Sequence, residues 1–111
     1  MEQSEYPKLV RDKIPAIIKE MTGKDTETRI LKTDEEFLDF LLQKMVEESI
    51  ELQKSVANDN LEEELADIFE LIYAILKLRG KSIDDIITIQ KEKRGKRGGF
   101  DERILMLKKV L

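Results

Sequence analysis

Apolar residues recur every three or four positions through the middle of the chain, which is the spacing of one face of a helix. Thr33 and Glu36 precede this stretch with the spacing of a capping box, in which each residue satisfies a backbone amide of the other. We therefore expect a helix over about residues 34–57. Its apolar stripe comprises Leu38, Leu41, Leu42, Met45, Leu52 and Val56.

A second long helix is expected over about residues 61–79. The sequence Asn-Asp-Asn at residues 58–60 is typical of a tight turn, and its last residue can cap the helix, with Glu63 completing a capping box. Gly80 can end the helix. Because the connection is so short, the two long helices should form an antiparallel hairpin.

A shorter helix is expected before the hairpin, over residues 13–21. Asp12 is its expected cap, Pro15 lies in its first turn and Gly23 follows its end. Residues 24–32 have no helical period, and we expect them to form a loop with extended stretches.

Another short helix is expected after the hairpin, over about residues 83–94. Ser82 and Asp85 have capping-box spacing at its start, and Gly95 is expected to break the chain after it. Residues 100–111 fit a helix or an extended segment equally well.

Composition agrees with an all-α fold, a hairpin or bundle of about four helices in a single domain over residues 1–111. Apolar residues make up 41% of the chain and charged residues 40%, which is typical of helices with solvated faces. Aromatic residues make up only 5%, too few to favour a sandwich or barrel.

Composition also excludes several kinds of chemistry. The chain has no cysteine and no histidine, which removes thiolate nucleophiles, zinc–imidazole sites and histidine-based acid–base catalysis. Its start lacks the pattern of a signal peptide, and no apolar run approaches the length of a membrane span. We expect a cytoplasmic protein with no membrane partner.

Five carboxylates lie near the turn of the expected hairpin. With 24 acidic residues in the chain, a solvated helix face is the ordinary interpretation of such a group. At about 100° per residue, however, one of them falls inside the apolar arc of its helix and two more fall at its borders. An uncompensated carboxylate there is costly, so a lysine, an arginine or a bound cation should accompany it. The five carboxylates are Glu47, Glu48 and Glu51 on the first helix and Glu64 and Asp67 on the second.

The antiparallel pairing places Glu51 level with Glu64, and Glu48 level with Asp67, so these four carboxylates can converge on one point. Glu47 points away from them. Oxygen ligands without histidine or cysteine favour Mg²⁺ or Mn²⁺ over zinc. Because Mg²⁺ is commonly held by a few carboxylates and the phosphates of a substrate, we expect a phosphorylated substrate.

Clustered cations fit the same interpretation, although basic residues at a helix end also simply complement the helix dipole. The glycine backbone beside one cluster can approach a phosphate closely. The Arg-Gly-Gly sequence resembles an RNA-binding tail, but few aromatic residues and a net charge of −4 favour a small nucleotide over a nucleic-acid polymer. The candidate phosphate-binding residues are Lys91, Arg94, Lys96 and Arg97, with a second patch of Lys8, Arg11 and Lys13.

These motifs resemble the all-alpha nucleoside triphosphate pyrophosphohydrolase (MazG-like) superfamily. Glu-Glu-x-x-Glu on one helix and Glu-x-x-Asp on the next are similar to its metal motif. The strings "YPKLVRDKIPAII" and "KRGGFDERI" are similar to those of a small subgroup labelled phosphoribosyl-ATP pyrophosphohydrolase-like, and the resemblance covers residues 6–104.

The resemblance implies Mg²⁺-dependent hydrolysis between the α- and β-phosphates of a nucleotide, releasing pyrophosphate. It implies that four carboxylates bind the metal and that one of them also orients or deprotonates water. It further implies phosphate binding by Lys91 and Arg94, and a homodimer or homotetramer. The implied metal and catalytic residues are Glu48, Glu51, Glu64 and Asp67.

Two alternatives accompany this expectation of a house-cleaning nucleotide pyrophosphohydrolase. The subgroup's label suggests phosphoribosyl-ATP, an intermediate of histidine biosynthesis, as the substrate. A non-catalytic helical interaction module would instead make the acidic residues a solvated face, and it predicts no metal binding.

Overall fold

The computed structural model describes residues 6–110, and within that range the chain forms helices and no strands. The expectation of an all-α fold is therefore confirmed. The start of the chain, where no signal peptide is expected, lies partly outside this range. No helix of the described part is long and apolar enough to cross a membrane. In chain order the elements are α1 (Ile14–Thr22), α2 (Asp34–Ser55), the 3₁₀ turn η2 (Val56–Asn58), α3 (Leu61–Leu78) and α4 (Ile83–Arg97).

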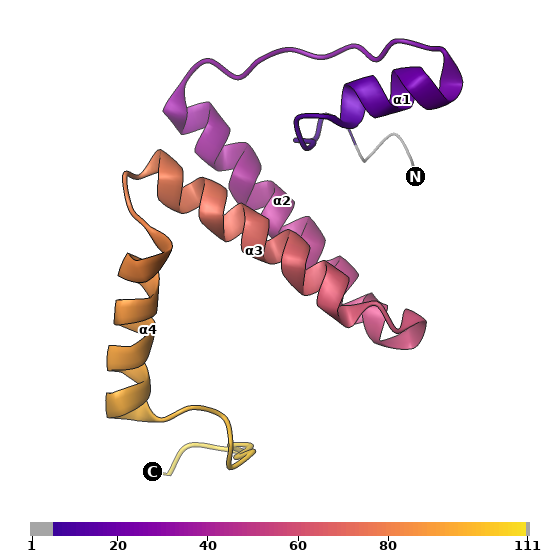
Figure 1. Ribbon diagram of the computed structural model, residues 1–111. Coiled ribbons are helices and arrows are strands. Elements are labelled where there is room, and N and C mark those ends of the chain that lie inside the picture. Colours follow the sequence, from indigo (N-terminus) through magenta and orange to yellow (C-terminus); the bar gives the residue numbers. More distant parts are fainter. Residues whose placement is uncertain (1–5, 111) are drawn as a thin grey trace.

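Helices α2 and α3 lie side by side and antiparallel along most of their length (Figure 1), as the short connection predicts. Leu41 of α2 and Leu71 of α3 are the buried apolar residues of the described chain. Ser55 is also buried at the end of α2, where its hydroxyl donates to the Leu52 carbonyl at 2.7 Å. The core is therefore a narrow seam between two helices.

The connection of the hairpin is longer than expected because α2 ends two residues early. After Ser55 the chain forms the 3₁₀ turn, and Asp59 follows in the left-handed region with φ of 57°. Asn60 is the N-cap residue of α3, but its side chain makes no capping hydrogen bond. The predicted box of Asn60 and Glu63 is therefore wrong.

Two other helix starts also differ from prediction. Lys13, not Asp12, is the N-cap residue of α1. Thr33 accepts a hydrogen bond from the Glu36 amide at 3.1 Å, but the Glu36 carboxylate binds Arg29 at 2.6 Å and does not close the box. The box is half formed because an arginine from the preceding loop provides a stronger, charged partner.

Helix α4 starts as predicted and ends later. Ser82 and Asp85 form the complete capping box. The helix continues through Gly95 to Arg97, so the prediction that Gly95 breaks it is wrong. A single glycine costs a helix only about 1 kcal/mol relative to alanine, and the cations of the last turn offset part of that by complementing the helix dipole.

The remaining segments are irregular. Residues 24–32 cross as the expected loop from α1 to α2, and α4 leads away from the hairpin into an extended segment at residues 104–110 (Figure 1). The extended form is thus the one adopted by the C-terminal tail. Its apolar side chains are almost fully exposed: Phe100, Ile104, Leu105, Met106, Leu107 and Val110.

Candidate metal centre

Three of the predicted carboxylates meet across the hairpin seam. Glu48 of α2 and Glu64 and Asp67 of α3 each offer one oxygen, and these oxygens lie within 4.8 Å of one another. Glu64 and Asp67 are three residues apart and so project from one side of α3, and Glu48 is brought to them by the antiparallel pairing. All three side chains are half-buried.

Glu51, the fourth predicted ligand, does not belong to this group and is exposed. It follows Glu48 by three residues and therefore points about 60° further round α2 than Glu48 does. Because the contact with α3 covers only a narrow side of α2, that rotation directs Glu51 to solvent. Its assignment as a metal ligand stays a prediction.

Lys44 is the lysine nearest to the group on α2. Its ammonium lies 3.7 Å from the Glu48 carboxylate and 3.3 Å from that of Glu47. Glu47 therefore shares a cation with Glu48, and its orientation away from the other carboxylates stays a prediction. The Lys44 side chain is only 20% exposed, so this cation is well placed to compensate part of the acidic charge.

The Glu48 carboxyl has a raised pKa. Burial is the largest cause, because the side chain is only 13% exposed. Hydrogen bonding with the Glu64 carboxyl and the charges of Asp67 and Glu64 raise the pKa further, and Lys44 partly opposes them. The site thus carries more negative charge than its own lysine neutralises.

Glu64 has an oxygen, Oε1, that is buried without a hydrogen-bond partner. The side-chain oxygen of Asn60, the N-cap residue of α3, is buried and unpartnered as well. Buried polar atoms normally have partners, and both oxygens are hard donors of the kind that bind Mg²⁺. The residues present therefore fit a hard divalent cation. The sequence marks Asn60 only as a helix cap, because no local pattern predicts that its side-chain oxygen is buried.

Arg11 reaches the site from the N-terminal segment. Its guanidinium donates to the Asp67 carboxylate at 2.7 Å across 56 positions of sequence. It was predicted to bind phosphate, and the structure places it directly beside one predicted metal ligand. No local pattern could reveal this pairing. Lys8, from the same patch, lies 5.3 Å from the centre of the Tyr6 ring.

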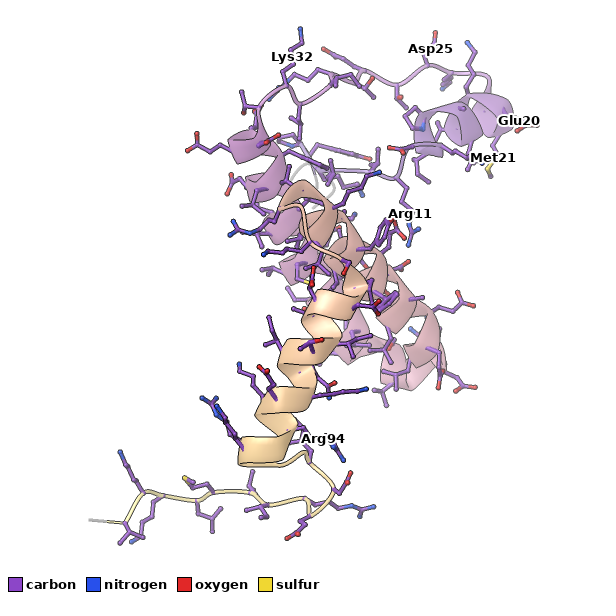
Figure 2. All side chains as sticks on the ribbon, turned by 60° about the vertical axis from the view of Figure 1, so that its left-hand side comes forward. Arg11, Glu20, Met21, Asp25, Lys32 and Arg94 are labelled. Atoms are coloured by element: carbon purple, nitrogen blue, oxygen red, sulfur yellow. The ribbon has the colours of Figure 1, made fainter. Side chains whose placement is uncertain are left out.

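The C-terminal cations lie elsewhere. All the predicted phosphate-binding residues of α4 are exposed, and Arg94 lies well apart from Arg11 in Figure 2. Arg94 pairs with Asp101 at 3.1 Å and lies over Gly99, where a Cβ atom would meet its guanidinium. Within one chain, α4 therefore does not deliver Lys91, Arg94, Lys96 or Arg97 to the carboxylates.

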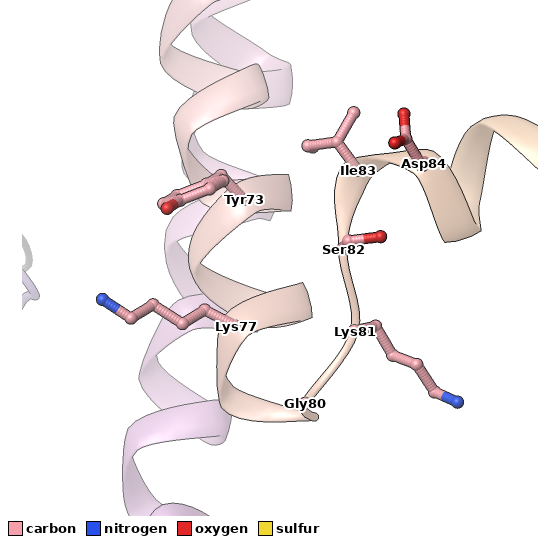
Figure 3. Close-up of a pocket in the computed structure, with 7 residues that line it drawn as sticks. All are labelled: Tyr73, Lys77, Gly80, Lys81, Ser82, Ile83 and Asp84. Carbon is pink, nitrogen blue, oxygen red and sulfur yellow. The ribbon is translucent and has the colours of Figure 1, made fainter.

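A separate open hollow lies at the corner between α3 and α4 (Figure 3). It has a volume of about 560 Å³ and is lined by Tyr73, Lys77 and the turn at residues 80–84. Lys77 and Lys81 point to opposite sides of the turn and do not converge on a common point. The hollow is therefore no substitute for the carboxylate group as a phosphate site.

No protein-family model, no curated protein and no solved structure matches this chain. The resemblance to the MazG-like superfamily consequently remains a prediction from the sequence motifs.

Proposed function

We propose that the chain is a Mg²⁺-dependent nucleotide pyrophosphohydrolase of the MazG-like kind, hydrolysing a nucleoside triphosphate between its α- and β-phosphates. The observation that carries the proposal is the group of Glu48, Glu64 and Asp67, which contains a buried oxygen without a partner. A solvated acidic face would not leave a carboxylate oxygen buried and unpartnered.

These three carboxylates would hold the cation, and Mn²⁺ could take its place. When bound, the ion supplies positive charge that stabilises the negative charge developing on the phosphoryl oxygens. One of these carboxylates would also orient or deprotonate the attacking water, and Glu48 is the candidate on α2. Arg11 is a predicted phosphate-binding cation that lies beside the group, through its bond to Asp67.

A second copy of the chain would cover apolar side chains that one copy leaves exposed on the hairpin. Exposed apolar residues form one row on each helix of the hairpin. At 100° per residue, each row lies about 80–180° around its helix axis from the buried leucine of that helix, Leu41 or Leu71, and both rows are rotated in the same direction. Because the two helices are antiparallel, equal rotations place both rows on the same face of the hairpin. We propose that a homo-oligomer covers this face, since water-exposed apolar faces of this kind favour association. The rows are Leu42, Val46 and Ile50 on α2 and Leu61, Leu65 and Phe69 on α3.

The first experiment measures pyrophosphate release from canonical and damaged nucleoside triphosphates and from phosphoribosyl-ATP, with Mg²⁺ or with EDTA. We expect Mg²⁺-dependent release that Glu64→Gln abolishes. Glu70→Gln is the matched control, because Glu70 lies on the same helix, is exposed and is outside the group. The substrate that reacts fastest distinguishes house-cleaning of triphosphates from a histidine-biosynthesis role.

No release from any substrate, together with no thermal shift on adding Mg²⁺, would contradict the proposal and favour a non-catalytic interaction module. Glu51→Gln refines the ligand set. Retained activity in this variant would limit the site to the three carboxylates that meet in the structure, whereas loss would restore Glu51 to the set.

A further inference from the structure

We propose that Arg11 is the resident counter-cation of Asp67 in the metal-free protein, and that it exchanges this carboxylate for a substrate phosphate when a divalent cation binds. The inference rests on the proposed function and extends it. It gives the N-terminal segment a role in the reaction cycle that the carboxylates alone would not require.

The contact itself is direct and charged. Arg11 donates to Asp67 at 2.7 Å, a short distance typical of charge-assisted hydrogen bonds. Asp67 is also one of the three residues whose oxygens lie within 4.8 Å of one another. A cation bound by that group would therefore have the Arg11 guanidinium as a close neighbour.

The two cations beside the carboxylates come from different parts of the chain. Lys44 lies 3.7 Å from Glu48 and comes from the same helix, so it belongs to the hairpin itself. Arg11 neutralises Asp67 from outside the hairpin, and the buried Glu64 oxygen has no partner. Lys44 also lies 3.3 Å from Glu47, so two cations serve four carboxylates and the metal-free group keeps a net negative charge. A divalent ion would neutralise that remaining charge and place a second positive charge close to the Arg11 guanidinium.

Arg11 is free to respond because its side chain is 57% exposed and that of Asp67 is 40% exposed. A solvent-accessible ion pair contributes little stability, so little is lost when it separates. A ligand shifts a protein toward the conformation that it binds more tightly. The divalent cation repels the Arg11 guanidinium, so it should bind more tightly when Arg11 has left Asp67 than when the two are paired. A nucleotide phosphate then offers the guanidinium a doubly hydrogen-bonded partner in place of Asp67.

The first test measures Mn²⁺ binding to the full-length chain without nucleotide, by electron paramagnetic resonance of free Mn²⁺. We expect Arg11→Gln to bind Mn²⁺ at least about fivefold more tightly than wild type, because a competing charge has been removed. Arg11→Lys keeps the charge and should stay close to wild type. Arg29→Gln is the matched control, since Arg29 binds Glu36 and not the carboxylate group.

Equal or weaker Mn²⁺ binding by Arg11→Gln would overturn the inference, and would make Arg11 a support for Asp67 instead of a competitor. Circular dichroism of each variant checks that the helices are retained.

The second test follows amide hydrogen exchange of residues 8–12 in the wild-type protein. We expect saturating Mn²⁺ to speed exchange there, and α,β-methylene-ATP added with Mn²⁺ to slow it again. Exchange unchanged by Mn²⁺ would overturn the proposal. If the wild-type chain binds Mn²⁺ and releases pyrophosphate while Arg11→Gln behaves like wild type, only this inference fails. If it does neither, the proposed function fails too.

Discussion

The hairpin α2–α3 and the C-terminal arm, defined as residues 83–110, are both built from apolar and charged residues but use them in opposite ways. The hairpin buries Leu41 and Leu71 in its seam, whereas the arm exposes its apolar side chains, with Leu107 86% exposed. Residues 34–78 contain 13 acidic and 3 basic residues, and residues 83–110 contain 5 acidic and 8 basic ones. Packing holds the hairpin together, while α4 depends on its own cap and backbone hydrogen bonds.

This contrast explains where the candidate chemistry lies. Only a packed seam can hold carboxylates half-buried and close to one another, and only such surroundings raise a carboxyl pKa as they do for Glu48. The cations of the arm stay solvated and keep ordinary surface pairs such as Arg94 with Asp101. The hairpin therefore gathers the candidate carboxylates, whereas the cations of the arm stay in solvent.

The largest expected effect is a difference in stability between two leucine-to-alanine variants, one in each region. Leu41→Ala should lower the free energy of unfolding by about 2–5 kcal/mol, because it empties the centre of the seam. Leu107→Ala should change it by less than about 0.5 kcal/mol in the monomer, because that side chain is already in water. Urea denaturation followed by circular dichroism measures both. Similar losses in the two variants would mean that the arm packs in solution.

A smaller effect on stability is expected when the N-cap hydroxyl of α2 or of α4 is removed. Thr33→Ala and Ser82→Ala each remove a hydroxyl that accepts a first-turn amide hydrogen bond, at a cost of about 1 kcal/mol to the helix. We expect Thr33→Ala to lower global stability, since α2 belongs to the packed hairpin. Ser82→Ala should instead speed amide exchange within α4 and leave the denaturation midpoint nearly unchanged. A global loss in both variants would show that α4 unfolds together with the hairpin.

The two regions should also respond to pH with opposite sign. The raised pKa of Glu48 means that the folded state keeps a proton that the unfolded chain releases, so stability falls as the pH rises through that pKa. The pKa of Asp85 is lowered by hydrogen bonds with the Ser82 backbone and side chain, so its contribution is lost as the pH falls.

Denaturation of wild type, Glu48→Gln and Asp85→Asn across the acidic range measures this difference. Glu48→Gln should remove part of the decline in stability with rising pH. Asp85→Asn should weaken α4 near neutral pH and make little difference at low pH. A Glu48→Gln profile parallel to that of wild type would indicate that solvent reaches the seam freely.

The smallest effect concerns the surface pair of the arm. Asp101→Asn should change stability by less than about 0.5 kcal/mol, since both partners are mostly exposed and water screens their attraction. Thermal denaturation at low and high salt checks this. A clear, salt-sensitive loss would show that the pair is buried in an assembly of several chains.

The sequence by itself determined the helices, because helix periodicity, caps and turn residues act over a few positions. The stripe of Leu38, Leu41 and Met45 and the box of Ser82 and Asp85 are local signals, and the hairpin followed from the short connection between two such helices. The same locality set the limits of prediction. Asn60 was expected to cap α3, yet its oxygen is buried instead, and Gly95 was expected to end α4, yet the helix passes through it.

Only the tertiary structure decided which carboxylates meet. Sequence spacing placed Glu48, Glu51, Glu64 and Asp67 near one level of the hairpin, but the width of the seam brought three together and left Glu51 in solvent. Arg11 pairs with Asp67 across 56 positions, and no periodicity or spacing encodes such a contact. Long-range electrostatic partners depend on how whole segments pack, and that information exists only once the chain has folded.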